Sequence, residues 1–247
     1  MRKAVIVFLA LATVIWAGQA LAKEHLPDAQ ILSQIQDRLY HSTVKKHGNV
    51  QATFQNGVAT LSGTVDSLGV RDEAVKAVSR VKDVERIEDN IQISTEDVTD
   101  PQIAEAARKR IVLYPFFTIF DWATLSSQNH TLTVSGYVTD PFKKIDIGQL
   151  LAFVKGVVKL QNNIEVLPTS GDDDQVRRAI ARAIYGDPYF IDYTNQALPP
   201  IHIIVKNLNV TLYGVVNTPL DRTKAEDDAR LAATFFNLTN DLHVEHE

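Results

Sequence analysis

The stretch Gly57-Val58-Ala59-Thr60-Leu61-Ser62-Gly63 decides the fold, because its pattern returns twice more along the chain. The further copies are Asn129-His130-Thr131-Leu132-Thr133-Val134-Ser135-Gly136 and Asn207-Leu208-Asn209-Val210-Thr211-Leu212-Tyr213-Gly214. Each copy alternates apolar and polar residues up to a glycine, which predicts the second strand of a β-hairpin. Each final glycine is followed 27 residues later by an Asn or Asp that opens a closing strand: Asn90-Ile91-Gln92-Ile93, Asn163-Ile164-Glu165-Val166 and Asp241-Leu242-His243-Val244. This constant spacing indicates one small unit repeated three times.

An amphipathic helix precedes each hairpin and a second helix follows it. The first helices carry apolar residues four apart, at Ile31, Ile35 and Leu39, at Ile103, Ala107 and Ile111, and at Val176, Ile180 and Ile184. The second helices carry them 11, 15 and 18 residues after the glycine, at Ala74, Val78 and Val81, at Ile147, Leu151 and Val154, and at Ala225, Ala229 and Ala232. These spacings place the apolar side chains on one helix face. Asp28, Asp100 and Asp172-Asp173-Asp174 mark the starts of the first helices.

We therefore predict an α+β fold of three tandem αββαβ units, each with two helices packed on one face of a three-stranded mixed sheet. The units are expected at residues 27–95, 98–167 and 171–247. Their first strands are expected near 49–55, 118–124 and 202–206, and residues 192–200 are read as an inserted surface loop. The repeated glycines indicate a bulge or the close approach of a packed helix.

The first 22 residues have the pattern of a secretory signal peptide. Arg2 and Lys3 precede an apolar stretch, and Ala20-Leu21-Ala22 supplies the small residues of a cleavage site. An uncleaved membrane anchor is the alternative, but the apolar stretch is shorter than the roughly 20 residues that a spanning helix needs. The chain has no cysteine, which excludes disulfides, thiolate metal sites, a cysteine nucleophile and lipid attachment to cysteine. We expect cleavage after Ala22 and a soluble exported protein.

The charge balance argues against nucleic acid as a partner. The net charge is −5, and it becomes −7 when Arg2 and Lys3 leave with the signal peptide. Such a chain does not bind polyanions indiscriminately, so contact with an anionic surface requires a local basic patch.

Motifs of known enzymes are absent from the sequence: there is no Gly-x-Ser-x-Gly elbow, His-Glu-x-x-His, P-loop or Gly-x-Gly-x-x-Gly. His243 and His246 are too few for a fixed metal site. Asp172-Asp173-Asp174 lacks the spaced ligands of a calcium loop and reads as a helix start. We predict no catalytic residue, no metal and no cofactor.

One basic and aromatic cluster in the second unit suits a lipid headgroup interface. The candidate lipid-contact residues are Arg108, Lys109, Arg110, Phe116, Phe117, Lys143 and Lys144. The other interpretation is that the aromatic rings fill the core and the cations form a solvated face.

The repeated unit resembles the BON domain, named for bacterial osmotically induced and nodulation proteins. Repeat one carries the resemblance best, in Gly57–Val65 and in Val84-Glu85-Arg86-Ile87-Glu88-Asp89-Asn90-Ile91; in repeat three Tyr213 replaces the serine before glycine. The resemblance implies a periplasmic, non-enzymatic envelope binding module that contacts anionic phospholipid surfaces and supports envelope integrity or stress tolerance. The alternative is a periplasmic scaffold, chaperone-like or interacting with other envelope proteins.

Overall fold

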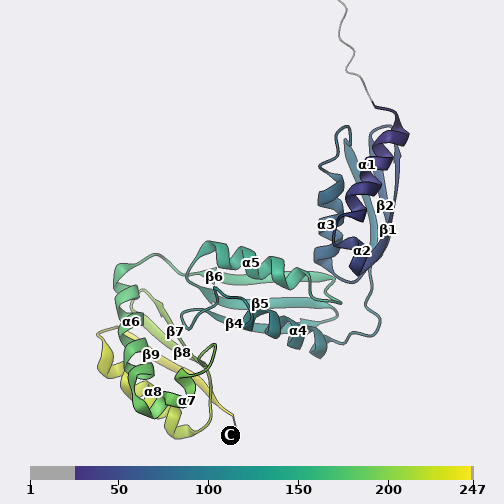
Figure 1. Cartoon of the computed structure of the whole chain (residues 1–247). Coiled ribbons are helices and arrows are strands. Elements are labelled where there is room, and N and C mark those ends of the chain that lie inside the picture. Colours follow the sequence, from purple (N-terminus) through teal and green to yellow (C-terminus); the bar gives the residue numbers. More distant parts are fainter. Residues whose placement is uncertain (1–25, 246–247) are drawn as a thin grey trace, which may run out of the picture.

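The computed structural model describes residues 26–245 and contains three similar units in a row, here called repeats 1, 2 and 3 (Figure 1). Repeat 1 consists of α1 (Asp28–Tyr40), α2 (Val44–His47), β1 (Gly48–Gln55), β2 (Val58–Val65), α3 (Leu68–Val78) and β3 (Arg86–Ile93). Repeat 2 consists of α4 (Asp100–Val112), β4 (Trp122–Gln128), β5 (Thr131–Val138), α5 (Pro141–Ala152) and β6 (Lys159–Val166). Repeat 3 consists of α6 (Gly171–Gly186), the short helices η1 (Pro188–Phe190) and α7 (Ile191–Thr194), β7 (Ile201–Lys206), β8 (Asn209–Val216), α8 (Pro219–Ala232) and β9 (Asn237–Val244).

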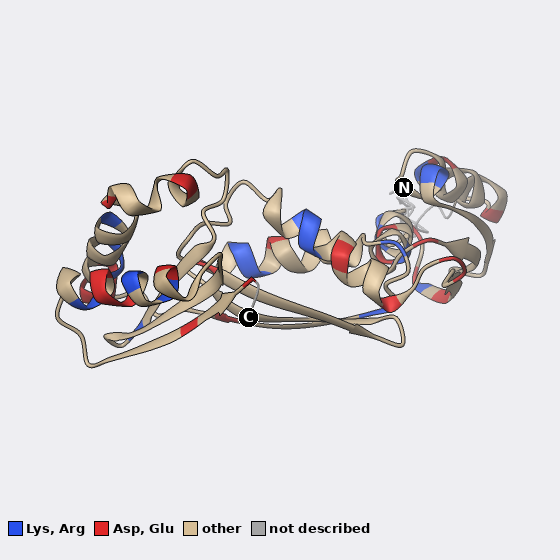
Figure 2. Ribbon diagram, turned by 90° about the horizontal axis from the view of Figure 1, so that it is seen from below, with Lys and Arg blue, Asp and Glu red and all other residues tan. Residues whose placement is uncertain are grey.

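Each repeat has its own mixed sheet, in the orders β1-β2-β3, β4-β5-β6 and β7-β8-β9. The first two strands pair antiparallel through the hairpin, and the third pairs parallel to the second after the crossover helix. The helices cover one face of each sheet (Figure 2) and bury a separate apolar core in each repeat. The predicted fold class and the three tandem units are therefore confirmed.

The spacing between glycine and Asn or Asp has a simple structural basis. Asn90, Asn163 and Asp241 occupy equivalent places, opposite Ser62, Ser135 and Tyr213 in the strand registers. They lie in mid-strand, however, because each closing strand begins four residues earlier. The sequence hides this start because the early residues of these edge strands are mostly polar, with a single apolar residue in each.

The hairpin turn is the same in all three repeats. Its two central residues have positive φ angles: Asn56 and Gly57, Asn129 and His130, and Asn207 and Leu208. This is the mirror-image turn that suits strand twist, although only repeat 1 has the usual Asn-Gly. The first strand predicted at 118–124 begins four residues too early. His130 does not look like a turn residue, so the turn at Asn129-His130 was not recognised from the sequence. The strand lies at Trp122–Gln128, and Thr118–Asp121 form a turn.

The repeated glycines are required by a neighbouring strand, neither by a bulge nor by a packed helix. Gly63 has a φ of +130°, and a Cβ there would lie 2.0 Å from the carbonyl oxygen of Asn49 on β1. Gly136 and Gly214 face backbone carbonyls in the same way. Each glycine has a single partner in the hairpin register, Val50, Ala123 and Ile201 respectively, so no extra residue is inserted.

The insertion in repeat 3 is more ordered than a surface loop. It begins with α7, and Tyr193 within it is buried in the core of the repeat. The predicted signal peptide, residues 1–22, lies outside the described residues. Among the helices of residues 26–245, none is long and apolar enough to cross a membrane.

Candidate functional site

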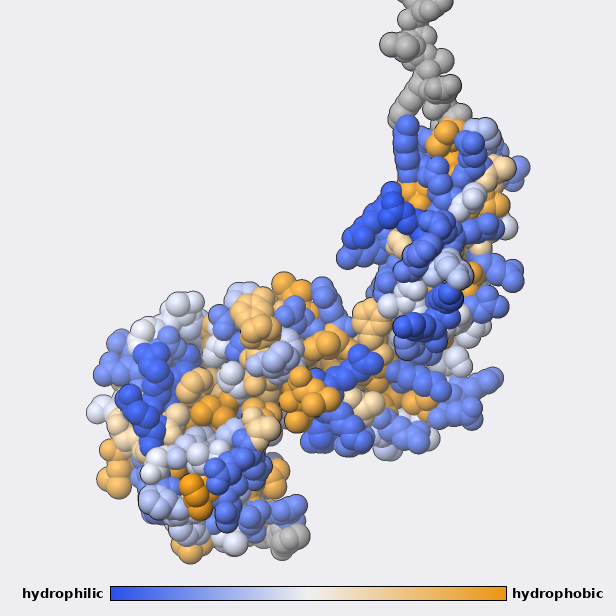
Figure 3. All heavy atoms as spheres, in the orientation of Figure 1, coloured by the Kyte–Doolittle hydropathy of each residue, from blue (hydrophilic) through white to orange (hydrophobic). Residues whose placement is uncertain are grey.

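The helical side of repeat 2 carries an exposed apolar patch next to basic residues. We define the apolar patch as five side chains that are 46–80% exposed: Val112, Leu113, Phe116, Phe142 and Ile145. They come from the end of α4, the turn after it and the first turns of α5. Figure 3 shows apolar side chains gathered over this middle unit. An exposed apolar cluster of this kind is typical of an interaction site.

The turn after α4 separates exposed from buried rings. The backbone folds tightly there, with N–H bonds from Tyr114 to the Ile111 carbonyl and from Phe117 to the Tyr114 carbonyl. Tyr114 is buried, and its hydroxyl donates to Asp146 at 2.7 Å; burial and this carboxylate together raise the pKa of the tyrosine. Phe116 points outward and meets Phe142 edge to face at 5.7 Å. The two rings therefore join the α4 and α5 sides of the patch.

Three of the predicted cations border this patch on α4. Arg108 and Lys109 are largely exposed and share the carboxylate of Glu105, at 3.5 and 3.7 Å. Exposed pairs of this kind contribute little to stability. Arg110 donates to the carbonyls of Leu150 and Phe153 at the end of α5, so it also links the two helices. Figure 2 shows basic segments on the helices of repeat 2, on the side away from its sheet.

Lys143 and Phe117 do not reach the surface, contrary to the sequence-based interpretation. Lys143 is 5% exposed, and its ammonium donates to Asp121 at 2.8 Å and to Thr139 at 2.7 Å. Asp121 is fully buried and also accepts the backbone N–H groups of Thr118 and Thr139. A buried, fully bonded ion pair cannot turn toward a headgroup. Phe117 is 9% exposed, within the core of repeat 2, and contacts the ring of His202.

Lys144 is half-buried at the edge of the same helix, and none of the ion pairs among the described residues includes its ammonium. Of the seven candidate residues, the structure therefore brings Arg108, Lys109, Arg110 and Phe116 to one surface, whereas Lys144 lies on the side of α5 that meets β6, where its carbonyl accepts the side-chain amide of Asn162. The sequence reading missed Val112, Leu113 and Ile145. Their signal was present, because apolar residues at positions off the buried stripe of an amphipathic helix are unusual.

Repeat 3 has a smaller version of this arrangement. Tyr189 and Leu220 occupy the places of Phe116 and Phe142, and both are exposed. The place of Lys143 is taken by Asp221, which accepts the hydroxyls of Tyr189 at 2.6 Å and Tyr193 at 2.8 Å. Burial alone would raise the pKa of Asp221, but these hydroxyl groups outweigh it and hold the pKa below its usual value.

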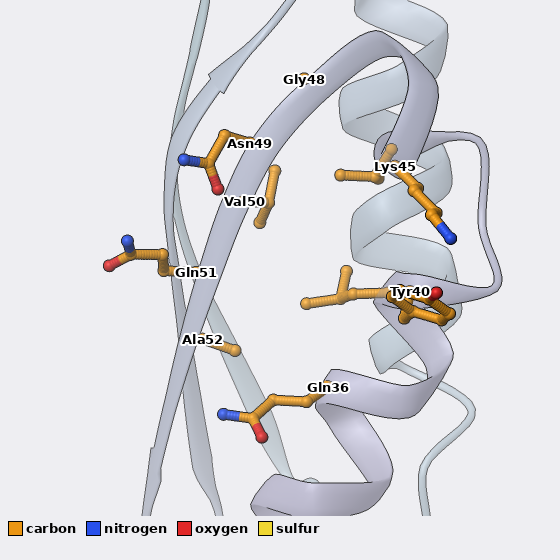
Figure 4. A pocket seen from close by; sticks show the side chains of 10 residues that line it. Gln36, Tyr40, Lys45, Gly48, Asn49, Val50, Gln51 and Ala52 are labelled. Carbon is orange, nitrogen blue, oxygen red and sulfur yellow. The ribbon is translucent and has the colours of Figure 1, made fainter.

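Two hollows lie on repeat 1. One, of about 550 Å³, opens between α3 and the end of α5, where Phe153 of repeat 2 covers Gly69. The other, of about 410 Å³, lies between α1, α2 and β1 (Figure 4). Neither contains a catalytic arrangement of side chains, and among residues 26–245 no group of three His, Asp or Glu residues could hold a metal ion. His243 is exposed in β9, and His246 lies outside the described residues.

Comparison with known proteins agrees with the repeated architecture. The family model of the BON domain matches three times, at residues 27–95, 99–168 and 172–245. No curated protein sequence matches the chain at a significant level.

Domains of type III secretion proteins are among the solved structures that match the chain. The C-terminal domain of CdsD, a structural protein of the type III secretion system of Chlamydia trachomatis, is 16% identical, covering 89% of this chain and 99% of that one, with a TM-score of 0.26. The periplasmic domain of the inner membrane protein PrgH from S. typhimurium is 10% identical, covering 86% of this chain and all of that one, with a TM-score of 0.21. At these scores the identification rests on the family match alone. The chain belongs to the BON domain family, a family of non-catalytic binding domains, and carries three of its domains in tandem.

Proposed function

We propose that the protein is a non-enzymatic module of the bacterial envelope that contacts anionic phospholipid headgroups through repeat 2 and supports envelope integrity under stress. The observation that carries this proposal is the apolar patch beside Arg108, Lys109 and Arg110. Exposed aromatic rings insert at the headgroup level, and cations around them meet the phosphates. The same surface includes α4 and α5, which are rigidly packed elements.

The magnitudes favour weak, reversible binding. Each cation near an anionic surface contributes on the order of 1 kcal/mol. Three cations and two exposed rings then suffice for transient contact, in spite of the net charge of −7 after cleavage. Screening by salt acts over a Debye length of about 8–10 Å, so binding weakens as ionic strength rises.

Co-sedimentation with vesicles tests the proposal. We expect wild-type protein to sediment with phosphatidylglycerol vesicles at low salt, less at moderate salt, and not with phosphatidylcholine vesicles. The double variant Arg108→Glu, Lys109→Glu should lose this binding. Its matched control is Arg178→Glu, Arg182→Glu, which makes the same charge change on the exposed face of α6. Equal binding by both variants would place the contact elsewhere.

The apolar part of the contact has its own test. Phe116→Ser with Phe142→Ser should reduce vesicle binding at moderate salt, where the charges are screened. Tyr189→Ser with Leu220→Ser makes the comparable change in repeat 3 and should have the smaller effect, since fewer cations adjoin it. A larger effect in repeat 3 would contradict the assignment to repeat 2.

Export supports the same proposal and is tested separately. We infer cleavage after Ala22 and release into the periplasm, with Lys23 as the first residue of the mature chain. Mass spectrometry of the exported protein measures this directly. A membrane-bound product that retains Met1 would contradict it.

The protein-binding scaffold remains the second candidate. The specific observation in its favour is the open strand edge and groove of repeat 1. If the wild-type protein does not sediment with phosphatidylglycerol vesicles at any salt concentration, the lipid proposal is ruled out and the scaffold function is left.

A further inference from the structure

β1 is an open edge strand without the usual protection. It lies at the end of the order β1-β2-β3, so no strand of the described chain pairs with its outer side. Its sequence, GNVQATFQ, contains no charged residue and no proline. The opposite edge, β3, carries Arg86, Glu88 and Asp89. Natural sheets block exposed edges with charges, prolines or covering segments, and only β3 follows that rule here.

The backbone groups that face outward can be assigned from the register. The Asp66 N–H donates to the His47 carbonyl across the pair at 2.9 Å. Along an antiparallel strand, the N–H and C=O groups of successive residues point alternately toward the paired strand and away from it. The N–H and C=O groups of Val50, Ala52 and Phe54 therefore point to the open side, and no backbone bond from another described segment reaches them.

A groove of about 410 Å³ accompanies this edge (Figure 4). Val50 and Ala52 point from β1 into the groove, whereas Asn49 and Gln51 point away from it. Leu39 and Val44 form its apolar floor. The only charged residue in its lining is Lys45, whose ammonium lies 3.8 Å above the ring of Tyr40 at the rim.

The corresponding edge in repeat 3 is occupied by another part of the chain. Ile203, the counterpart of Ala52, donates its outward N–H to the Ile119 carbonyl of repeat 2 at 2.7 Å. Ile119 and Phe120 also pack on the core of repeat 3, and Leu198 of repeat 3 packs on the core of repeat 2. A backbone carbonyl of the turn at Thr118–Asp121 in repeat 2 therefore already bonds to the first-strand edge of repeat 3.

In the other repeats the segment between first helix and first strand is longer and buries aromatic rings in the core. The segment between first helix and first strand buries Tyr114 and Phe117 in repeat 2, and Phe190 and Tyr193 in repeat 3. In repeat 1 this segment is shorter and buries only Val44. The strand position of Ala52 holds larger side chains in the others, Leu125 and Ile203. Repeat 1 thus lacks both the longer segment and its buried rings.

We propose that repeat 1 binds an extended peptide segment of a partner protein, which adds to β1 as a further strand and places an aromatic side chain in the groove. Main-chain hydrogen bonds supply the affinity of such strand addition, and the pocket for one side chain supplies the specificity. Lys45, with the exposed Lys46 next to it, favours an acidic residue beside the aromatic one. This surface lies on repeat 1 and does not overlap the apolar patch of repeat 2.

The probe is a labelled peptide with the sequence of residues 114–121, Tyr-Pro-Phe-Phe-Thr-Ile-Phe-Asp, which includes the segment that meets the edge of β7. It is titrated into the mature chain, residues 23–247, and anisotropy and amide hydrogen exchange are measured. We expect saturable binding with slower exchange at Val50, Ala52 and Phe54. A scrambled peptide of the same composition is the peptide control.

Two variants test the edge and the groove separately. Ala52→Pro removes one outward N–H without removing a bond to β2, and Ala52→Leu fills the groove with the residue found in repeat 2 while keeping the backbone. Each should weaken peptide binding by about tenfold. Gln51→Ala, on the opposite face, should leave it unchanged, and vesicle binding by Ala52→Leu should equal that of wild type.

Three results would overturn the proposal. They are absence of saturable binding, exchange protection away from β1, and unchanged binding by both Ala52 variants. Dimerisation in sedimentation equilibrium that Ala52→Pro abolishes would assign the edge to a second copy of the chain instead of a partner peptide. Loss of vesicle binding in the apolar-patch variants, with peptide binding intact, separates this site from the proposed lipid contact.

Discussion

At the scale of single residues, Gly63 shows how a backbone constraint differs from a packing preference. A Cβ at Gly63 would lie 2.0 Å from the Asn49 carbonyl, and a φ of +130° strains any other residue. Gly63→Ala should therefore lower stability by roughly 1–3 kcal/mol or more. Gly171→Ala is the control, since nothing lies within 4 Å of the added methyl group. Urea midpoints measure both, and equal midpoints would show that β1 shifts without cost.

The buried pair of Lys143 and Asp121 gives a second prediction at this scale. Lys143→Ala leaves the carboxylate of Asp121 buried without its cation, which typically costs about 3–5 kcal/mol. Lys144→Ala, one residue along α5, removes only a half-buried cation and should change stability little. Thermal unfolding compares the two. Similar melting temperatures would mean that water or a backbone shift replaces the ammonium.

At the scale of elements, one aspartate in each first helix holds the hairpin turn of its repeat. Asp28 accepts the N–H of Asn56, Asp100 accepts those of Asn129 and His130, and Asp173 accepts those of Asn207 and Leu208. Each aspartate lies three residues before the first residue of the apolar stripe. The aspartate that the sequence indicates as a helix start therefore also connects the helix to the sheet through hydrogen bonds to the hairpin turn.

Two neighbouring aspartates of α6 allow the contribution of these hydrogen bonds to be measured. Asp173 is fully buried, whereas Asp172 is exposed one residue earlier. Asp173→Ala should cost roughly 1.5–3 kcal/mol, the range for hydrogen bonds to a charged group. Asp172→Ala should cost little, because only its interaction with the helix dipole is lost. Denaturant unfolding and amide exchange at Leu208 measure the difference. Fast exchange of this amide in both variants, or in neither, would contradict a role of Asp173 in holding the turn.

At the scale of the whole molecule, repeats 2 and 3 are joined by aromatic side chains on the outer faces of their sheets. Trp122 stacks on Tyr213 with ring centroids 5.2 Å apart and planes 3° apart. His202 contacts Trp122 and Phe117. Lys206 pairs with Glu165 at 2.5 Å at the exposed margin. Such contacts favour a fixed arrangement of these two repeats.

The buried His202 makes this interface sensitive to pH. Burial lowers the pKa of His202 below its usual 6.5, although the backbone carbonyls of Asp121 and Thr118 and the carboxylate of Asp121 act in the opposite direction. Because the folded-state pKa is depressed, the stability is complete above about pH 6.5 and is lost as pH falls below it. Trp122 is the only tryptophan after Ala22, so its fluorescence reports on this interface.

We expect the fluorescence of Trp122 to change between pH 7.5 and about pH 5 as protonation loosens the contact between repeats 2 and 3. His202→Phe keeps a buried ring and removes the titrating group, so its fluorescence should stay constant over that range. His47→Phe, which alters an exposed histidine of repeat 1, should behave like wild type. A wild-type signal without pH dependence would mean that His202 stays buried and neutral.

The sequence by itself determined the repeat, the order of elements and the core. Those features follow from local periodicity: Ile31, Leu61 and Ala74 are all fully buried as their spacing predicts. The resemblance to the BON domain also rests on such local patterns. The helix pattern likewise placed Arg108 and Lys109 on the surface.

Only the tertiary structure decided what each polar or aromatic residue does. Lys143 and Lys144 are adjacent and identical in type, yet one is buried because Asp121 lies across from it, 22 residues away in the chain. Phe116 and Phe117 are separated into surface and core by one tight turn. The open edge of β1 became apparent only beside the covered edge of β7. Burial, ion pairing and edge coverage depend on segments distant in sequence, and local periodicity carries no information about them.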